Sequence, residues 1–293
     1  MHVMIECENL THYYGKRLIY ENLSFRVPEG RILGLLGKNG TGKTTTINIL
    51  SGFLRPRSGV CRIFGQDITS MPPQLRRDIG LLIEGHVQYT FMNISQIEKF
   101  YSRFYPGWRR DVYYDLMSML KVAPQQQISR MSCGQRSQVA LGLLMAQNPS
   151  LLILDDFSLG LDPGYRRLFI DYLRDFVKTD GKTVFLTSHI IQDMERLIDD
   201  CIIMDYGRIL IQNPVASLLR EYYSYTFRME NPGPIGLPGL YHPTLRKDRM
   251  EVGALMPPQA MEALLRSNGI AYSDFSGSHV PLEDVFIGLT GKY

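Results

Sequence analysis

The sequence has 293 residues, with 32 basic and 29 acidic side chains and a net charge of +3. A charge so nearly balanced, without a basic run, argues against nucleic acid as the main partner. Hydrophobic residues make up 44% and charged residues 21%, as in a globular protein with a core, and the length allows one large domain and a small second one.

The chain shows no sequence feature of secretion or membrane insertion. Its first residues carry acids where a signal peptide needs a basic flank, and no apolar run approaches the roughly 20 residues that span a bilayer. The four cysteines are scattered, which predicts reduced thiols and neither a disulfide framework nor a zinc site. We therefore expect a cytoplasmic protein that would serve a membrane only through a partner.

The N-terminal part of the chain predicts four short strands, at Val3–Ile5, Leu23–Val27, Arg31–Leu36 and Val60–Phe64. A turn at Tyr13-Tyr14-Gly15 would separate the first two. A glycine-rich loop follows the third strand, and a helix is predicted from Lys43 to Leu50. From about Gln88 to Gln147 apolar residues recur at spacings of three and four, which indicates helices.

Strands alternate with helices again after residue 150, at Leu151–Asp155, Pro163–Lys178 and Thr183–Thr187. Pro163 suits a first helical turn, and Gly181 suits a helix end. This alternation predicts an α/β fold in which helices cover a mostly parallel sheet and the preceding helical block is an insertion.

The tail after residue 213 has its own pattern. A tract rich in proline and glycine, Asn231–Pro243, precedes a predicted strand, helix and strand at Met250–Leu255, Pro258–Leu265 and Ile270–Phe275. We predict a main domain over residues 1–213, with a helical part at about 86–148, and a small C-terminal α/β domain over residues 214–293.

The segment Gly37–Thr44, named here the glycine loop, has the pattern Gly-x-x-x-x-Gly-Lys-Thr. Glycines at this spacing let successive backbone N–H groups surround phosphate oxygens, and the dipole of the following helix favours the same anion. Lys43 would bridge the β- and γ-phosphates, and the Thr44 hydroxyl would contact Mg²⁺. The predicted nucleotide-binding residues here are Gly37, Asn39, Gly40, Thr41, Gly42, Lys43, Thr44 and Thr45.

The predicted strand Leu151–Asp155 runs into a second carboxylate at Asp156. Ligands of open parallel sheets bind at the carboxyl ends of the strands, where these side chains emerge. The pair suggests carboxylates that face a ligand, with Asp155 on the Mg²⁺ side, although acids also simply end core strands.

A short segment, Met131–Gln135, stands a little before this strand, and a lone His189 follows the strand after it. Because Gln135 comes three residues after Ser132, the two form a capping-box pattern at the start of a helix running to about Gln147. With the glycine loop, this order of motifs resembles the nucleotide-binding subunit of an ATP-binding-cassette (ABC) transporter, over nearly the whole chain.

The resemblance implies a P-loop NTPase cassette, with an N-terminal antiparallel β segment and a helical subdomain, that binds ATP and Mg²⁺. Ser132, Gly134 and Gln135 match the signature Leu-Ser-Gly-Gly-Gln, which faces ATP bound to the opposite subunit; Cys133 replaces one of its glycines. Asp155 matches the aspartate on the Mg²⁺ side. Asp156 occupies the catalytic-base position, which normally holds glutamate, so the resemblance also implies slow hydrolysis.

Further positions are assigned through the same resemblance. His189 matches the switch histidine that contacts the γ-phosphate. Asp162 matches the D-loop aspartate, although it would also serve as an ordinary N-cap. Tyr14 matches the aromatic residue that stacks on adenine, with Tyr13 as the neighbouring alternative. Glu84 stands where the family normally has glutamine, and its carboxylate would reach Mg²⁺ or the attacking water, unless it is a solvated loop acid.

Aromatic residues are dense between Tyr89 and Tyr114. Helix packing would account for Phe100, Tyr101 and Phe104. Tyr89, Phe91 and Trp108 fall in predicted loops, in the region where the family receives a helix of the membrane subunit; docking and core packing both remain open for them.

The resulting hypothesis is an ATPase subunit that pairs head to tail with a copy of itself or a paralogue and drives a separate membrane permease from the inner face of the membrane. The tail Pro281–Phe286 resembles that of exporter subunits. A soluble ABC ATPase acting on ribosomes or DNA is disfavoured, since the chain shows neither a second cassette nor a basic tail. A hydrolysis-weak cassette that acts as an ATP-dependent clamp or sensor stays open because of Asp156.

Overall fold

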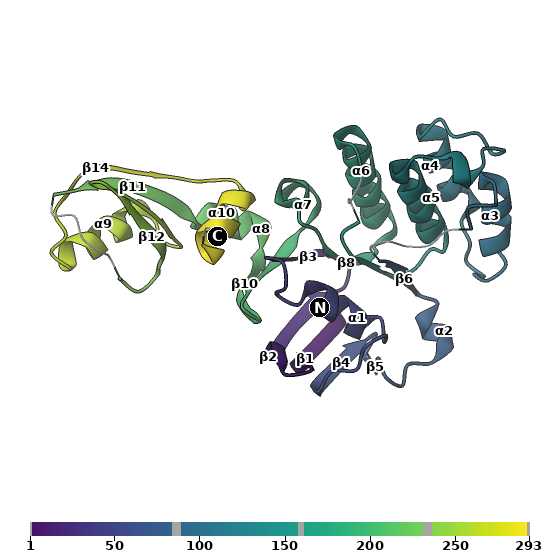
Figure 1. Ribbon diagram of the computed structural model, residues 1–293, viewed down its shortest axis with the longest axis horizontal. Coiled ribbons are helices and arrows are strands. Elements are labelled where there is room, and N and C mark those ends of the chain that lie inside the picture. Colours follow the sequence, from purple (N-terminus) through teal and green to yellow (C-terminus); the bar gives the residue numbers. More distant parts are fainter. Residues whose placement is uncertain (1, 84–88, 158–160, 231–235, 292–293) are drawn as a thin grey trace.

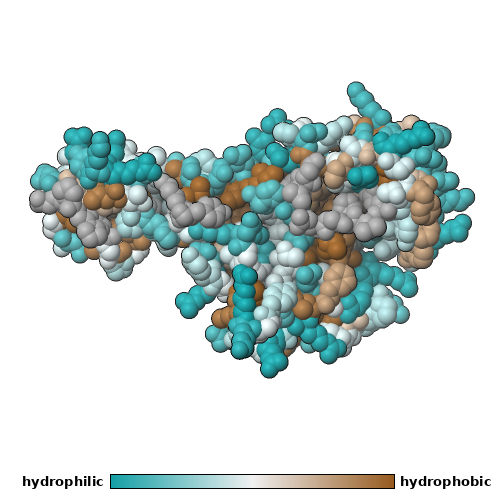
Figure 2. All heavy atoms as spheres, viewed as in Figure 1, coloured by the Kyte–Doolittle hydropathy of each residue, from teal (hydrophilic) through white to brown (hydrophobic). Residues whose placement is uncertain are grey.

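The computed structural model describes residues 2–83, 89–157, 161–230 and 236–291. A main body carries a smaller C-terminal part on one side (Figure 1), and hydrophobic residues gather where the two parts meet (Figure 2). None of the helices in these ranges is long and apolar enough to cross a bilayer.

A six-stranded sheet forms the centre of the main body, in the order β10-β9-β3-β8-β7-β6. Its strands are β3 (Ile32–Gly37), β6 (Ile79–Leu82), β7 (Leu151–Leu154), β8 (Thr183–Thr187), β9 (Asp200–Asp205) and β10 (Arg208–Pro214). All pairs are parallel except β9 with β10. The mostly parallel sheet predicted from the sequence is confirmed.

An antiparallel sheet packs below the central sheet in Figure 1, in the order β2-β1-β4-β5. Its strands are β1 (Val3–Tyr14), β2 (Arg17–Pro28), β4 (Ser58–Ile63) and β5 (Gln66–Asp67). The position predicted for the turn, Tyr13-Tyr14-Gly15, is wrong for its first two residues. Tyr13 and Tyr14 still pair with β2, and Gly15 and Lys16 form the turn. The backbone of Tyr14 is therefore positioned by its pairing with β2 and not by a turn.

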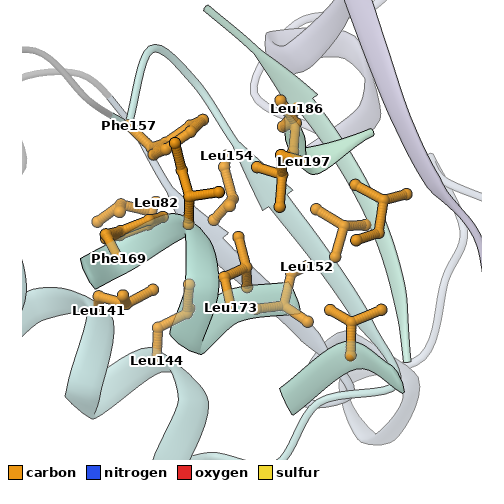
Figure 3. Close-up of a cluster of buried hydrophobic side chains, with 14 of the residues drawn as sticks. Leu82, Leu141, Leu144, Leu152, Leu154, Phe157, Phe169, Leu173, Leu186 and Leu197 are labelled. Atoms are coloured by element: carbon orange, nitrogen blue, oxygen red, sulfur yellow. The ribbon is translucent and has the colours of Figure 1, made fainter. Parts of the chain in front are cut away.

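Helices of the main body lie on both sides of the central sheet. They are α1 (Lys43–Leu50), α2 (Pro73–Arg76), α3 (Ile94–Tyr101), α4 (Arg110–Met119), the 3₁₀ turn η1 (Ile128–Arg130), α5 (Cys133–Ala146), α6 (Pro163–Asp180) and α7 (Ile191–Leu197). Helices α1 and α2 lie on the side of the antiparallel sheet, and α4 to α7 lie on the opposite side (Figure 1). Helix α6 begins at Pro163 and ends at Gly181 with a φ of 62°, as its sequence predicts. Figure 3 shows the apolar contact, where Leu152 and Leu154 of β7 meet Phe169 and Leu173 of α6.

One aromatic residue near α3, Phe104, is placed differently from the prediction, and for Trp108 the structure decides between the two open alternatives. Phe104 is 56% exposed and does not belong to the core, because the chain leaves α3 after Tyr101 and turns outward. Trp108 is half-buried and its Nε1–H donates to a carboxylate oxygen of the buried Glu98, at 3.0 Å. Helix α3 also begins with a capping box between Asn93 and Gln96, which the sequence analysis did not identify.

The C-terminal part has an antiparallel sheet in the order β12-β13-β11-β14. Its elements are α8 (Val215–Glu221), β11 (Tyr223–Met229), β12 (Leu240–Arg246), β13 (Arg249–Ala254), α9 (Pro258–Ser267), β14 (Tyr272–Ser278) and α10 (Leu282–Thr290). Helix α10 returns to the main body, where Leu282, Val285 and Leu289 are buried in its core. The domain boundary at residues 213 and 214 stays a prediction.

Candidate functional site

The glycine loop connects β3 to the N-terminus of α1. Helix α1 has no side-chain cap; its N-cap residue is Gly42, at a φ of 103°. A Cβ at Gly42 would lie 2.8 Å from the ring of Tyr20, so both the backbone angle and the space require glycine. The uncapped N-terminus therefore presents backbone donors and a positive dipole end to the space beside the loop.

Lys43 forms hydrogen bonds within the glycine loop. Its ammonium group donates to the carbonyl oxygens of Gly37, at 2.7 Å, and Lys38, at 3.0 Å. Burial lowers the pKa of Lys43, and the nearby carboxylates of Asp156 and Asp155 oppose this shift. The positive charge thus stands next to two carboxylates at the end of the central sheet.

Most of the predicted site residues share one cavity of about 310 Å³. The predicted residues that line it are Tyr14, Asn39, Gly40, Gly42, Lys43, Thr44, Thr45, Asp155, Asp156 and His189. Gly37 and Thr41 belong to the glycine loop but not to the lining, and Thr41 Oγ1 donates to Lys38 O at 2.8 Å. Between the two neighbouring tyrosines, Tyr14 lies at the cavity and Tyr13 does not.

The buried Asp155 is oriented by the neighbouring strand. Strands β7 and β8 are parallel and in register at Leu154 and Leu186, which brings their next residues, Asp155 and Thr187, side by side. Thr187 Oγ1 donates to Asp155 Oδ1 at 2.6 Å and accepts from the backbone N–H of Asp156 at 3.1 Å. Thr187 thereby determines the direction of the two successive acids.

Asp156 turns toward the cavity with a positive φ of 44°. Aspartate tolerates this left-handed conformation better than most residues because its short polar side chain bonds locally. Its carboxylate accepts from Nδ1–H of His189, which lies 2.7 Å from Oδ1 and 2.8 Å from Oδ2. The arrangement leaves Nε2 of His189 as a second polar atom at this more exposed end of the site.

The signature residues lie elsewhere. Ser132 begins α5 with the predicted capping box: its Oγ accepts from Gln135 N at 3.2 Å, and Gln135 Oε1 accepts from Ser132 N at 3.1 Å. Ser132, Gly134 and Gln135 do not line the cavity. Asp162 is the N-cap residue of α6 but its side chain makes no capping bond, so the ordinary capping role is wrong. Glu84 falls outside the described residues.

Four residues of the cavity wall were not among the predicted site residues, namely Arg17, Ile19, Thr187 and Ser188. Arg17 and Ile19 come from β2, which pairs with the end of β1. No local sequence pattern predicts that these two residues line the cavity. The sequence could have identified Thr187 as a site residue, because it ends a strand predicted to be parallel to the one that carries Asp155.

Similarity to known proteins agrees with this geometry. Residues 20–158 match the family model described as ABC transporter. The chain is 29% identical to the uncharacterized ABC transporter ATP-binding protein YhcH of Bacillus subtilis (strain 168), over 79% of this chain and 77% of that protein. It is also 29% identical to the Nod factor export ATP-binding protein I of Rhizobium meliloti, over 99% of this chain and 89% of that protein.

Among solved structures, the ATP binding subunit of an ABC transporter is similar at 26% identity and a TM-score of 0.66, over 74% of this chain and 92% of that chain. The residues that match the family model, 20–158, include the glycine loop, Asp155 and Asp156. Residues 20–158 therefore contain an ABC transporter ATP-binding domain, within a structure similar to that of an ABC transporter's ATP binding subunit.

Proposed function

We propose that this protein is the ATP-hydrolysing subunit of an ABC exporter and energises a separate membrane permease. One observation carries the ATPase part: a single cavity brings together Lys43, the acids Asp155 and Asp156, and His189. The export part is supported by the relatives named Nod factor export ATP-binding protein I, which align with nearly all of this chain.

The residues at the cavity fit a magnesium nucleotide. Thr44 and Asp155 both line it and offer hydroxyl and carboxylate oxygens, the ligand type that Mg²⁺ prefers. When bound, Mg²⁺ would neutralise charge on the phosphates. Lys43 would exchange its bonds to the loop carbonyls for bonds to phosphate oxygens, and the backbone N–H groups at the start of α1 would complete the phosphate site. Tyr14, 49% exposed beside the loop, would stack on the base.

Asp156 is the proposed general base. A base must lie within hydrogen-bond reach of the water it polarises, directly or through one further water. Nδ1–H of His189 donates to the Asp156 carboxylate and orients it. Because aspartate is shorter than the usual glutamate by one methylene, we propose that hydrolysis is slow while ATP affinity is ordinary.

A second ATPase subunit would complete each site. Ser132 is exposed at the start of α5, and neither Ser132 nor Gln135 lines the cavity of its own chain. We propose that this N-terminus, together with Gly134, contacts the γ-phosphate bound to the opposite subunit in a head-to-tail pair.

Two exposed aromatic residues are proposed to contact the permease. Tyr89 is 44% and Phe91 is 73% exposed, and their rings lie 5.9 Å apart. Tyr89 also packs edge-to-face on Phe100 at 5.3 Å, which extends the aromatic surface to Phe104. Trp108 is removed from this proposal because its hydrogen bond to Glu98 gives it a structural role.

Affinity capture of the intact chain from native membranes tests the proposal. The tagged protein should retain one integral-membrane protein, and Phe91→Ala should release it while ATP binding is kept. Phe53→Ala is the matched control, since Phe53 is also exposed, at 67%, in the turn after α1. Capture of no membrane protein, or equal release by both variants, would contradict the permease assignment.

The clamp alternative is favoured by one observation, the aspartate at the base position. In that case ATP binding would close the dimer and hydrolysis would play no part. Equal single-turnover rates for the natural chain and Asp156→Asn would replace the proposed ATPase role with the clamp.

A further inference from the structure

Arg17 lines the cavity beside the glycine loop, and the proposed ATPase function does not use it. It begins β2 and pairs directly with Tyr14, the last residue of β1. Directly opposite residues of an antiparallel pair place their side chains on the same face of the sheet. Arg17 and Tyr14 therefore project to the same side, toward the cavity that both of them line.

The guanidinium group of Arg17 lies against the glycine loop. Its Nη2 atom is 3.3 Å from the point where a Cβ on Gly40 would lie, and Gly40 has a φ of 80°. Glycine at this position thus leaves room for the guanidinium group beside the loop backbone. The side chain of Arg17 accordingly extends from its pairing position beside Tyr14 to the loop that would surround phosphates.

The charge of Arg17 is available for a ligand. Its side chain is exposed and, among the residues that the structure describes, forms no hydrogen bond or ion pair. Lys43, by contrast, donates to two loop carbonyls. An acid, Asp205, lines an adjoining cavity of about 340 Å³ together with Arg17, but it is buried and its Oδ1 accepts from the backbone N–H of Tyr206 at 3.1 Å. A guanidinium group without a carboxylate partner suits a phosphate, to which it donates two parallel N–H bonds.

The position of Arg17 along the nucleotide follows from its neighbours. In the proposed ATP complex the base stacks on Tyr14, and the β- and γ-phosphates lie at Lys43 and the start of α1. The ribose and the α-phosphate connect these two parts of the nucleotide. Arg17 starts beside Tyr14 and its guanidinium group reaches Gly40, so it accompanies this connecting part. The α-phosphate is the charged group of that part.

We propose that Arg17 binds the α-phosphate of the nucleotide. This inference rests on the proposed ATP site and adds a contact that Lys43 and the acids do not supply. Because ATP, ADP and AMP all carry an α-phosphate, the contact strengthens the binding of all three and does not distinguish ATP from the product ADP. Adenosine, which has no phosphate, gains nothing from it.

A nucleotide series tests the proposal with the full chain. Competition against a fluorescent ATP analogue gives the affinities of ATP, ADP, AMP and adenosine for the natural chain and for Arg17→Gln. The natural chain should bind AMP about 10-fold more tightly than adenosine. Arg17→Gln should weaken ATP, ADP and AMP each by about 10-fold, the effect of losing one hydrogen bond to a charged group, and leave adenosine unchanged.

Lys16→Gln is the matched control, because Lys16 is an exposed cation of the preceding turn that lines neither cavity. It should bind all four ligands as the natural chain does. The proposal is overturned if Arg17→Gln binds ATP normally, if only ATP is weakened, or if adenosine is weakened as much as AMP. It is equally overturned if AMP binds the natural chain no more tightly than adenosine, or if Lys16→Gln has the same effect as Arg17→Gln.

Lys43→Met separates these outcomes from a failure of the proposed function. If the natural chain binds ATP and Lys43→Met weakens it while Arg17→Gln does not, only the α-phosphate contact is wrong. If the natural chain binds none of the nucleotides, the proposed ATP site itself is wrong, and the role of Arg17 with it.

Discussion

Nδ1 of His189 lies 2.7 Å from Oδ1 of Asp156, which joins the residues that follow β8 and β7. The bond orients an exposed histidine and a partly exposed carboxylate toward the same end of the cavity. Each side chain is oriented by its hydrogen bond to the other as well as by the strand that precedes it. We propose that this pair is the centre of ATP hydrolysis, because it lies in the same cavity as Lys43.

His189→Ala should slow hydrolysis and leave ATP affinity nearly unchanged. The variant removes the donor that orients Asp156, and a misplacement of about 1 Å in a catalytic constellation costs on the order of 100-fold in rate. Single-turnover hydrolysis gives the rate, and equilibrium binding of ATP is the control readout. A variant that hydrolyses ATP at the natural rate would mean that His189 does not orient the base.

Lys43→Met should weaken ATP by about 10- to 100-fold, because a charge-assisted bond to phosphate is lost while the aliphatic stem stays. Lys178→Met, at the end of α6, is the control and should bind ATP normally. Binding is measured by titration with a fluorescent ATP analogue in the presence of Mg²⁺. Unchanged affinity in the Lys43 variant would remove the lysine from the phosphate site.

Gly42→Ala should destabilise the fold, because φ is 103° there and the new Cβ would collide with the ring of Tyr20. Left-handed backbone strain at a residue other than glycine costs about 1–3 kcal/mol, and the collision adds to it. Gly164→Ala in α6 is the control, since its Cβ would meet nothing within 4 Å. Denaturant unfolding measures both, and equal stability of the two variants would contradict the strain at Gly42.

Lys38→Met should loosen α10 from the main body. The Lys38 ammonium donates to Thr290 O at 2.7 Å, near the negative end of the α10 dipole. Loss of this partly buried bond costs about 1 kcal/mol, or a fall of about 2 °C in Tm. Hydrogen exchange of the α10 amides should accelerate in this variant and stay unchanged in Lys178→Met. Unchanged exchange in the Lys38 variant would show that the bond does not hold the helix.

Local signals in the sequence predicted the elements that local physics determines. Helix α1 and strand β8 have the predicted bounds, and α5 starts with the predicted capping box at Ser132, because caps, glycines and apolar runs act within a few residues. The mostly parallel central sheet followed from the alternation of strands and helices. The glycine pattern and the rule that ligands bind at the carboxyl ends of parallel strands placed Lys43 and the two acids at one site, whereas Tyr14 and His189 were assigned to it through the family resemblance.

Contacts between distant segments were not predictable in the same way. Arg17 reaches the cavity through the pairing of β1 with β2, and the return of α10 to the main body depends on packing across more than two hundred residues. The exposure of Phe104 was missed because α3 ends at Tyr101, whereas the apolar residues at helical spacing continue to Phe104. Spacing shows which residues share a helix face but not where the helix stops.

Single-turnover hydrolysis of the natural chain, Asp156→Glu and Asp156→Asn tests the central claim most directly. Glutamate adds one methylene, about 1.5 Å of reach per C–C bond, and asparagine cannot accept the proton. The proposal predicts a marked gain with glutamate, a loss with asparagine and similar ATP affinity in all three. Equal rates in the three proteins would contradict the role of Asp156 as the base.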